Sequence, residues 1–236
     1  MSLVSFDGVS VSVPVPGQDR KQLLSGIDLR LNEPRIAVIG ANGSGKSTLL
    51  RLINGLIVPS RGEVTVNGLS TRSQGSKVRR RVGFVFTDPL SQLVMPTGRE
   101  DVELSLRAGV RDRSSRHAAA ERVLADFGLL ELADQSIYDL SGGERQLLAL
   151  ATVLAVSPEI LVADEPTTLL DLRNGIRIGR LLEELPQQLI FSTHDLDLAA
   201  RADRILVIDD GKVAYDGGPE AAIGFYRKLA SGGVQH

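Results

Sequence analysis

The chain has 236 residues, and its composition, 42% hydrophobic and 24% charged, is that of one large globular domain. A formal net charge of −2 gives no general attraction to nucleic acid, so we expect no nucleic-acid partner. The absence of cysteine excludes disulfides, thiolate metal sites and a cysteine nucleophile.

Hydrophobic patterning, taken in chain order, predicts a strand-rich start followed by alternating strands and helices. The expected strands are residues 6–13, 27–31, 35–39, the hairpin-like 62–68, 82–86, 160–163, 188–192, 205–208 and 212–215. The expected helices are residues 47–53, 101–107, 114–127, 141–156, 174–185 and 195–201. A turn cluster is expected at 14–19. No secretory signal and no apolar run near the ~20 residues of a bilayer span is visible, so we expect membrane contact only through a partner.

A glycine-rich loop follows the apolar run at 35–39. Glycines let backbone N–H groups turn toward a phosphate chain, and the helix that follows presents further free N–H groups. Lys46 is expected to reach the β- and γ-phosphates, and Ser47 to bind Mg²⁺. The loop in this strand-to-helix setting predicts nucleotide binding by Gly40, Ala41, Asn42, Gly43, Ser44, Gly45, Lys46, Ser47 and Thr48. By itself it does not separate ATPases from GTPases or kinases.

Two acidic residues, Asp164 and Glu165, end the apolar run at 160–163. The carboxyl ends of parallel strands meet at the sheet edge where the phosphates are expected. Asp164 is expected to hold Mg²⁺ through its waters, and Glu165 to act as the general base toward the attacking water. The predicted fold is therefore α/β: a P-loop NTPase core of mostly parallel sheet, with an N-terminal antiparallel β extension and an inserted helical subdomain.

The segment Leu140-Ser141-Gly142-Gly143-Glu144-Arg145-Gln146 resembles the signature of ABC ATPases, and with it most of the chain resembles the nucleotide-binding subunit of an ABC transporter. The resemblance implies an ATPase that uses ATP and Mg²⁺ and pairs head to tail with a second subunit, as a homodimer. The residues that contact the partner's ATP are then Ser141, Gly142, Gly143 and Glu144.

Two further segments fit the resemblance. Residues 167–171 resemble the D-loop, which places Asp171 along the dimer interface. Thr193-His194-Asp195 resembles the switch region, which implies that His194 contacts the γ-phosphate and orients water, as a catalytic residue beside Glu165. His117 and His236 have no such setting and are interpreted as surface residues.

Two positions depart from the family pattern. Thr87 stands where the family has a glutamine that contacts Mg²⁺ and water, so its role as a metal ligand is doubtful. Near Val13 the family has an aromatic residue that stacks on adenine, and the nearest aromatic here is Phe6. These departures leave open a nucleotide-binding regulatory module that scarcely turns over.

Residues 88–97 resemble the short insert of energy-coupling-factor ATPases, which drive uptake of vitamins, cobalt or nickel. The resemblance implies a multi-spanning membrane subunit docking near Thr87–Asp101 and a peripheral place on the cytoplasmic face of the cell membrane. The short chain resembles the ATPases of biotin transporters, without direct contact to the transported substrate. A soluble ABC ATPase of a cofactor-assembly machine is the alternative.

The domain organisation expected is one ABC ATPase domain over 1–236, with an ATP-binding core at 1–86 and 157–236 and a helical signature subdomain at about 87–156. The basic run Lys77–Arg81 lacks interleaved aromatic residues, so we interpret it as a solvated strand entry rather than a nucleic-acid site. If the subunit docks beneath a membrane, the same run can also face lipid head groups.

Overall fold

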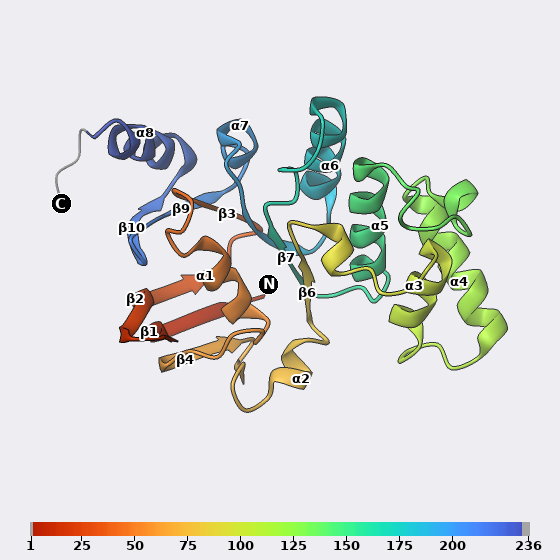
Figure 1. Cartoon of the computed structure of the whole chain (residues 1–236), viewed down its shortest axis with the longest axis horizontal. Coiled ribbons are helices and arrows are strands. Elements are labelled where there is room, and N and C mark those ends of the chain that lie inside the picture. Colours follow the sequence, from red (N-terminus) through yellow and green to blue (C-terminus); the bar gives the residue numbers. More distant parts are fainter. Residues whose placement is uncertain (1, 233–236) are drawn as a thin grey trace.

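Two β-sheets lie on either side of helix α1 (Lys46–Ile53) in the computed structural model, which describes residues 2–232 (Figure 1). The six-stranded sheet has the order β10-β9-β3-β8-β7-β6, and all its neighbours are parallel except β9 and β10. Its strands are β3 (Arg35–Ile39), β6 (Val82–Val85), β7 (Ile160–Asp164), β8 (Gln188–Ser192), β9 (Arg204–Asp209) and β10 (Lys212–Gly217).

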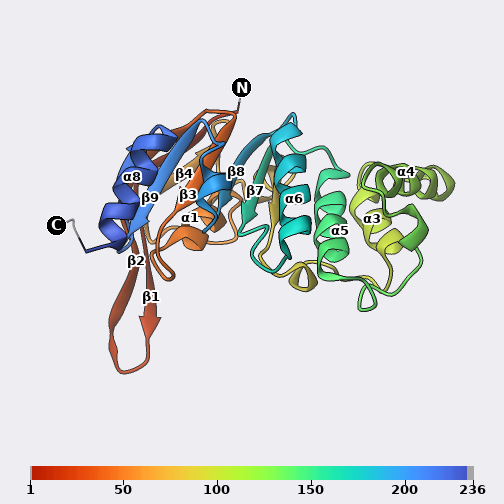
Figure 2. The ribbon, with the colours of Figure 1, turned by 90° about the horizontal axis from the view of Figure 1, so that it is seen from above.

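The second sheet is antiparallel, in the order β2-β1-β4-β5. Its strands are β1 (Val4–Val15), β2 (Gln18–Leu31), β4 (Arg61–Val66) and β5 (Leu69–Ser70). Strands β1 and β2 are longer than predicted, because they extend past the buried part of the sheet as a projecting hairpin (Figure 2). The turn cluster expected at 14–19 is accordingly reduced to the residues between Val15 and Gln18.

Both faces of the parallel strands are buried, which explains their continuous apolar runs. Alternate residues of β3 point to different cores: Ile36 and Val38 pack with α1 and the antiparallel sheet, whereas Ala37 and Ile39 pack with the helices of the opposite face. Those helices stand in a row in Figure 2 and are α5 (Gly142–Leu154), α6 (Leu172–Glu184), α7 (Leu196–Ala199) and α8 (Pro219–Ala230). The predicted α/β fold is confirmed.

A helical lobe lies at one end of the molecule, beside α5 (Figures 1 and 2). It contains η1 (Pro89–Ser91), α3 (Gly98–Leu106), α4 (Arg113–Asp126) and η2 (Leu130–Leu132). A short helix, α2 (Gly75–Val78), precedes β6. The patterns predicted neither α2 nor α8.

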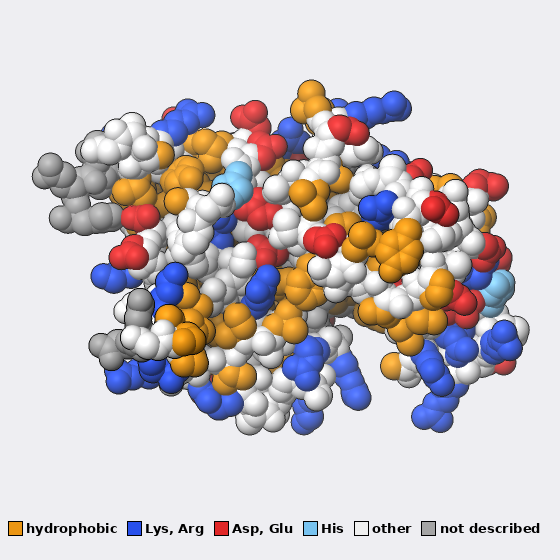
Figure 3. Space-filling view, viewed as in Figure 1, with side chains coloured by type: hydrophobic (Ala, Val, Ile, Leu, Met, Phe, Trp, Pro, Cys, Tyr) orange, Lys and Arg blue, Asp and Glu red, His pale blue; other side chains and the backbone are white. Residues whose placement is uncertain are grey.

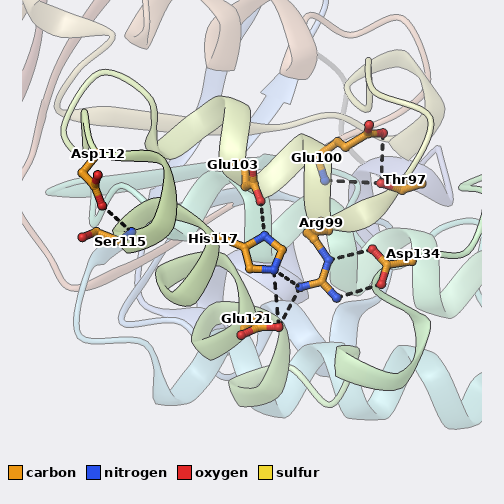
Figure 4. Close-up of polar contacts among 9 residues, drawn as sticks. All are labelled: Thr97, Arg99, Glu100, Glu103, Asp112, Ser115, His117, Glu121 and Asp134. Carbon is orange, nitrogen blue, oxygen red and sulfur yellow. Dashed lines mark hydrogen bonds and ion pairs between the residues drawn. The ribbon is translucent and has the colours of Figure 1, made fainter.

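Arg99 connects three segments of the helical lobe through hydrogen bonds (Figure 4). Its side chain is 15% exposed; it donates two hydrogen bonds to Asp134, at 2.6 and 2.8 Å, and a third to Glu121 at 3.0 Å. The hydrogen bonds from Arg99 lower the pKa of Asp134. His117 lies at the surface, as expected, with its Nδ1 2.7 Å from Glu103, whereas His236 falls outside the described residues. The lobe is thereby linked from α3 to α4 and to the segment after η2.

We find no helix among residues 2–232 with the length and hydrophobicity that crossing a bilayer requires.

Candidate nucleotide site

The glycine-rich loop at 40–48 joins the carboxyl end of β3 to α1. Gly45 forms the N-cap of α1 with a φ of 116°, and a Cβ there would lie 2.8 Å from Leu24 Cδ2, so only glycine fits. The Lys46 side chain is 6% exposed, and its Nζ donates to the carbonyls of Gly40 (2.9 Å) and Ala41 (3.2 Å). Burial lowers the pKa of the Lys46 ammonium, while nearby carboxylates oppose that shift.

Asp164 and Ser47, the two predicted metal ligands, are in contact. Asp164 Oδ1 accepts hydrogen bonds from Ser47 Oγ at 2.9 Å and from Ser192 Oγ at 2.8 Å. The Asp164 side chain is buried, and its Oδ2 lies 3.8 Å from Arg51. A carboxylate and a hydroxyl at this separation offer the hard oxygen ligands that Mg²⁺ prefers, so the residues present fit the cation.

Glu165 is buried and adopts a left-handed conformation with a φ of 52°, which a residue with a Cβ rarely takes. Its Oε2 accepts from Thr168 Oγ1 at 2.8 Å. Its Oε1 lies 3.0 Å from His194 Nε2 and 3.9 Å from Lys46 Nζ. The structure therefore brings together the predicted base, the predicted switch histidine and the loop lysine, which come from three separate segments.

Ser192 and Thr168 are polar contacts of this site that the sequence patterns did not single out. Ser192 is fully buried and pairs with Asp164 across neighbouring parallel strands. Its hydroxyl accepts from the backbone N–H of Glu165 at 2.9 Å and donates to Asp164. One hydroxyl thus connects both acidic residues. Its place at the end of a buried strand, just before Thr193-His194, was the available signal.

An open cavity of about 460 Å³ lies in front of these groups. Its walls include Asn42, Lys46, Glu165 and His194. Thr87 also lines it, and the Thr87 hydroxyl donates to the backbone carbonyl of Asp164 at 2.9 Å. The hydroxyl proton of Thr87 is therefore used to join the end of β6 to the end of β7.

Phe6 does not line this cavity. It is fully buried in the core beneath the antiparallel sheet, so it is not available to stack on a base. The cavity wall on the side of the β1–β2 hairpin is made by Lys21 and Leu23 instead.

The segment at 141–144 lies apart from this cavity and begins α5 with a capping box. Ser141 Oγ accepts from the Glu144 N–H at 3.3 Å, and the Ser141 N–H donates to Glu144 Oε2 at 2.7 Å. These hydrogen bonds lower the pKa of Glu144. The carboxylate of Glu144 is thus used within its own helix, whereas Gly142 is exposed.

Gly143 lies at a close contact between α5 and the side chain of Asn174 on α6. A Cβ on Gly143 would lie 2.5 Å from Asn174 Cγ. Asn174 is in turn bonded to Asp171, whose side chain caps α6 by accepting from the Asn174 N–H at 2.8 Å and from its side-chain amide at 2.9 Å. The predicted signature and D-loop are therefore neighbours in one chain. Residues 141–144 lie outside the cavity wall beside Lys46, whereas Thr168 of the predicted D-loop forms part of that wall.

Comparisons with known proteins identify the family. The family model described as ABC transporter matches residues 24–168. The chain is 43% identical over 208 residues to the biotin transport ATP-binding protein BioM of Rhizobium etli, which covers 88% of this chain and 92% of that protein. It is 38% identical over 204 residues to the energy-coupling factor transporter ATP-binding protein EcfA1 of Halalkalibacterium halodurans, with 84% and 73% covered.

Solved structures agree with the sequence relatives. A dimeric ATP-binding cassette in a post-hydrolysis state, bound to ADP and Pi, superposes with a TM-score of 0.84 at 31% identity and covers 92% of this chain and 98% of that chain. The family match over residues 24–168 includes the glycine-rich loop, the two acidic residues and the signature. The chain therefore belongs to the ABC transporter family, as an energy-coupling-factor-type ATPase subunit that hydrolyses ATP with Mg²⁺ and couples hydrolysis to transport.

Proposed function

We propose that the chain powers uptake of a vitamin, with biotin as the leading candidate, and acts as a head-to-tail homodimer on the cytoplasmic face of the cell membrane. The similarity to BioM supports biotin. The observation that carries the dimer is the separation of the two half-sites: the loop, Glu165 and His194 share one cavity, whereas residues 141–144 lie outside it. A second subunit is needed to bring a signature to the phosphates.

In this proposal the charged and polar residues of the site have distinct roles in ATP hydrolysis. Lys46 leaves the carbonyls of Gly40 and Ala41 and pairs with the β- and γ-phosphates, which compensates its burial. Glu165 accepts the proton of the attacking water, and His194 holds the Glu165 carboxylate and the γ-phosphate in line. Mg²⁺, when bound by Ser47 and Asp164, supplies charge neutralisation of the phosphates.

The domain organisation follows from the same elements. We assign the ATP-binding core to residues 1–86 and 157–236 and the helical signature subdomain to about 87–156. The boundaries fall just after β6, which ends at Val85, and just after α5, which ends at Leu154.

The membrane subunit is proposed to dock on the segment Thr87–Asp101. Asp101 is buried, and its Oδ1 accepts from the N–H groups of Val94 and Met95, both at 2.9 Å. Val94 is 69% exposed although its backbone is fixed in this way. The Val94 side chain is therefore available for contact with an apolar side chain of the partner.

Gln92 connects this docking segment to both subdomains. Its Oε1 accepts from the Phe86 N–H at 3.3 Å, and its Nε2 donates to the Ala149 carbonyl of α5 at 2.9 Å. A displacement of the segment by a membrane subunit is therefore passed directly to the helix that begins with the signature.

The alternative, a soluble cofactor-assembly ATPase, has no support among these relatives.

The experiment is affinity purification of the tagged chain from detergent-solubilised membranes of its host, followed by reconstitution. We expect a multi-spanning protein to be recovered, and the reconstituted complex to accumulate labelled biotin with ATP but not with ADP. Uptake of labelled cobalt and nickel is measured in parallel, as the alternative substrates. Recovery of no multi-spanning protein would refute the transporter role, whereas ATP-driven uptake of another substrate would refute biotin alone.

A further inference from the structure

The segment around α2 carries a concentrated positive charge that ATP hydrolysis does not use. Residues 69–87 contain five basic residues and no acidic residue. Arg81 pairs with Glu159 at 3.6 Å. Lys77, Arg79 and Arg80 are exposed and, within residues 2–232, form no ion pair. Their charge is therefore available to an external anion.

Beside these side chains lies an open hollow of about 520 Å³. Its walls include Arg72, Lys77 and Arg79 together with the hydroxyl-bearing Ser73 and Ser76. The guanidinium of Arg79 lies against the backbone of α2: its Nη1 is 3.0 Å from the position that a Cβ on Gly75 would take. A cation held against a hollow with hydroxyl groups around it suits a phosphate group.

An apolar side chain borders the same hollow. Val58 lies in its wall with 45% of its surface exposed, and Leu56, two residues earlier in the chain and not part of the wall, is 47% exposed. Basic and hydroxyl groups beside exposed aliphatic groups match a ligand that carries a phosphate at one end and hydrocarbon at the other. Free phosphate alone has no use for the aliphatic part.

A second basic cluster stands on the helical lobe, in the link between α3 and α4. It consists of Arg107, Arg111 and Arg113, all exposed. The one acidic residue among them, Asp112, accepts hydrogen bonds from Ser115 N–H at 2.7 Å and Ser114 Oγ at 2.8 Å, which hold its pKa at about 2. The cluster keeps a net charge of +2, from three arginines and one aspartate.

Both clusters lie along one edge of the molecule. In Figure 3 the Lys and Arg side chains gather at the lower edge over α2 and over the α3–α4 link, and the surface is hollowed between them. The proposed docking segment, which runs from the end of β6 through η1 into α3, lies between these two sides (Figure 1). A membrane subunit seated there has the two basic clusters on either side of it.

We propose that this basic edge binds the anionic phospholipid head groups of the membrane leaflet, and that the hollow beside Arg79 takes one head-group phosphate. The inference rests on the proposed function, because the membrane subunit places the edge near a bilayer. Each basic side chain at such a surface contributes about fivefold to partitioning. Removal of three therefore lowers vesicle binding roughly 100-fold at low ionic strength, and salt weakens binding of the parent chain.

The test uses the triple variant Lys77→Gln/Arg79→Gln/Arg80→Gln. The matched control, Arg180→Gln/Arg227→Gln/Lys228→Gln, removes the same charge from α6 and α8, which lie along the opposite edge (Figure 1). Both are assayed for ATPase activity and for flotation with protein-free vesicles of phosphatidylcholine, with and without phosphatidylglycerol. We expect both variants to retain ATPase activity, and only the first to lose binding to phosphatidylglycerol vesicles.

Equal vesicle binding by the triple variant and the parent would overturn the proposal. A second arm measures inorganic phosphate binding by calorimetry with a non-hydrolysable ATP analogue filling the nucleotide site. Loss of phosphate binding without loss of vesicle binding would identify a free anion and also overturn it. Because the vesicles contain no protein, co-purification of the membrane subunit remains a separate readout. A parent chain that recovers that subunit but ignores anionic vesicles refutes only the lipid proposal.

Discussion

Replacement of Ser192 by alanine tests whether one buried hydroxyl sets the geometry of Asp164 and Glu165. Ser192 is fully buried, so no bulk water replaces its oxygen. The change removes a hydrogen bond to the charged Asp164, at 2.8 Å, and leaves the N–H of Glu165 without its acceptor. A charge-assisted bond and a buried unpaired N–H together cost about 3 kcal/mol.

The catalytic effect follows from the backbone of Glu165. Its left-handed conformation costs about 1–2 kcal/mol and is held in place by the bond to Ser192. Without that bond the carboxylate relaxes from its position beside His194, and a misplacement of about 1 Å costs roughly 100-fold in rate. We expect kcat to fall by about that factor, with ATP affinity changed little, because Lys46 and the glycine-rich loop are untouched.

The assay combines steady-state ATPase kinetics, nucleotide titration and denaturant unfolding. Ser5→Ala is the matched control, since Ser5 is buried in β1, where it pairs with Arg30 and Thr65, and it does not line the cavity. Ser192→Thr keeps the hydroxyl and is expected to restore most of kcat. A Ser192→Ala enzyme with the parent's kcat, or one whose loss lies entirely in ATP affinity, would refute the reasoning.

Four further outcomes are expected. Glu165→Gln retains ATP binding and accumulates the dimer in size-exclusion chromatography, with kcat lowered at least about 100-fold; phosphate release at the parent rate would show that another group is the base. Thr87→Gln raises kcat by supplying the family's amide, and an unchanged or lower rate means that the site has adapted to the threonine. Gly143→Ala forces a Cβ to within 2.5 Å of Asn174 and costs about 1–3 kcal/mol in unfolding free energy, whereas a stable variant would disprove this contact. The pKa of Glu144 is lowered in the folded state, so its capping contribution is present above the unfolded pKa and lost as pH falls through the folded pKa; denaturant melts at successive pH values are expected to show a smaller acid loss for Glu144→Gln.

The sequence predicted the structure best where the backbone conformation depends on a few neighbouring residues. The Asn67-Gly68 turn was predictable because both residues take positive φ, 49° and 76°, which their types allow. The capping box of Ser141 and Glu144 was likewise visible from spacing alone. The glycine-rich loop belongs to the same class of local signals.

Other features depend on contacts that the pattern of residues along the chain does not predict. Helix α8 starts at Pro219 with Gly218 as its N-cap and no side-chain cap, so no capping residue marked its start, and the patterns did not predict it. The sequence could not decide whether Phe6 stacks on a base, because its complete burial depends on how the antiparallel sheet packs. Ser192 is connected to Glu165 only through the parallel pairing of β7 and β8, which no single strand reveals.

The two hydrogen bonds of Gln92 bear on which amino-acid substitutions this chain tolerates. Both of its hydrogen bonds go to backbone atoms, those of Phe86 and Ala149. Side-chain changes at those two positions that leave the backbone in place therefore keep both hydrogen bonds, whereas a change at Gln92 that loses the amide or its length breaks them. The proposed docking surface can accordingly vary with its partner while one amide keeps the segment attached to α5.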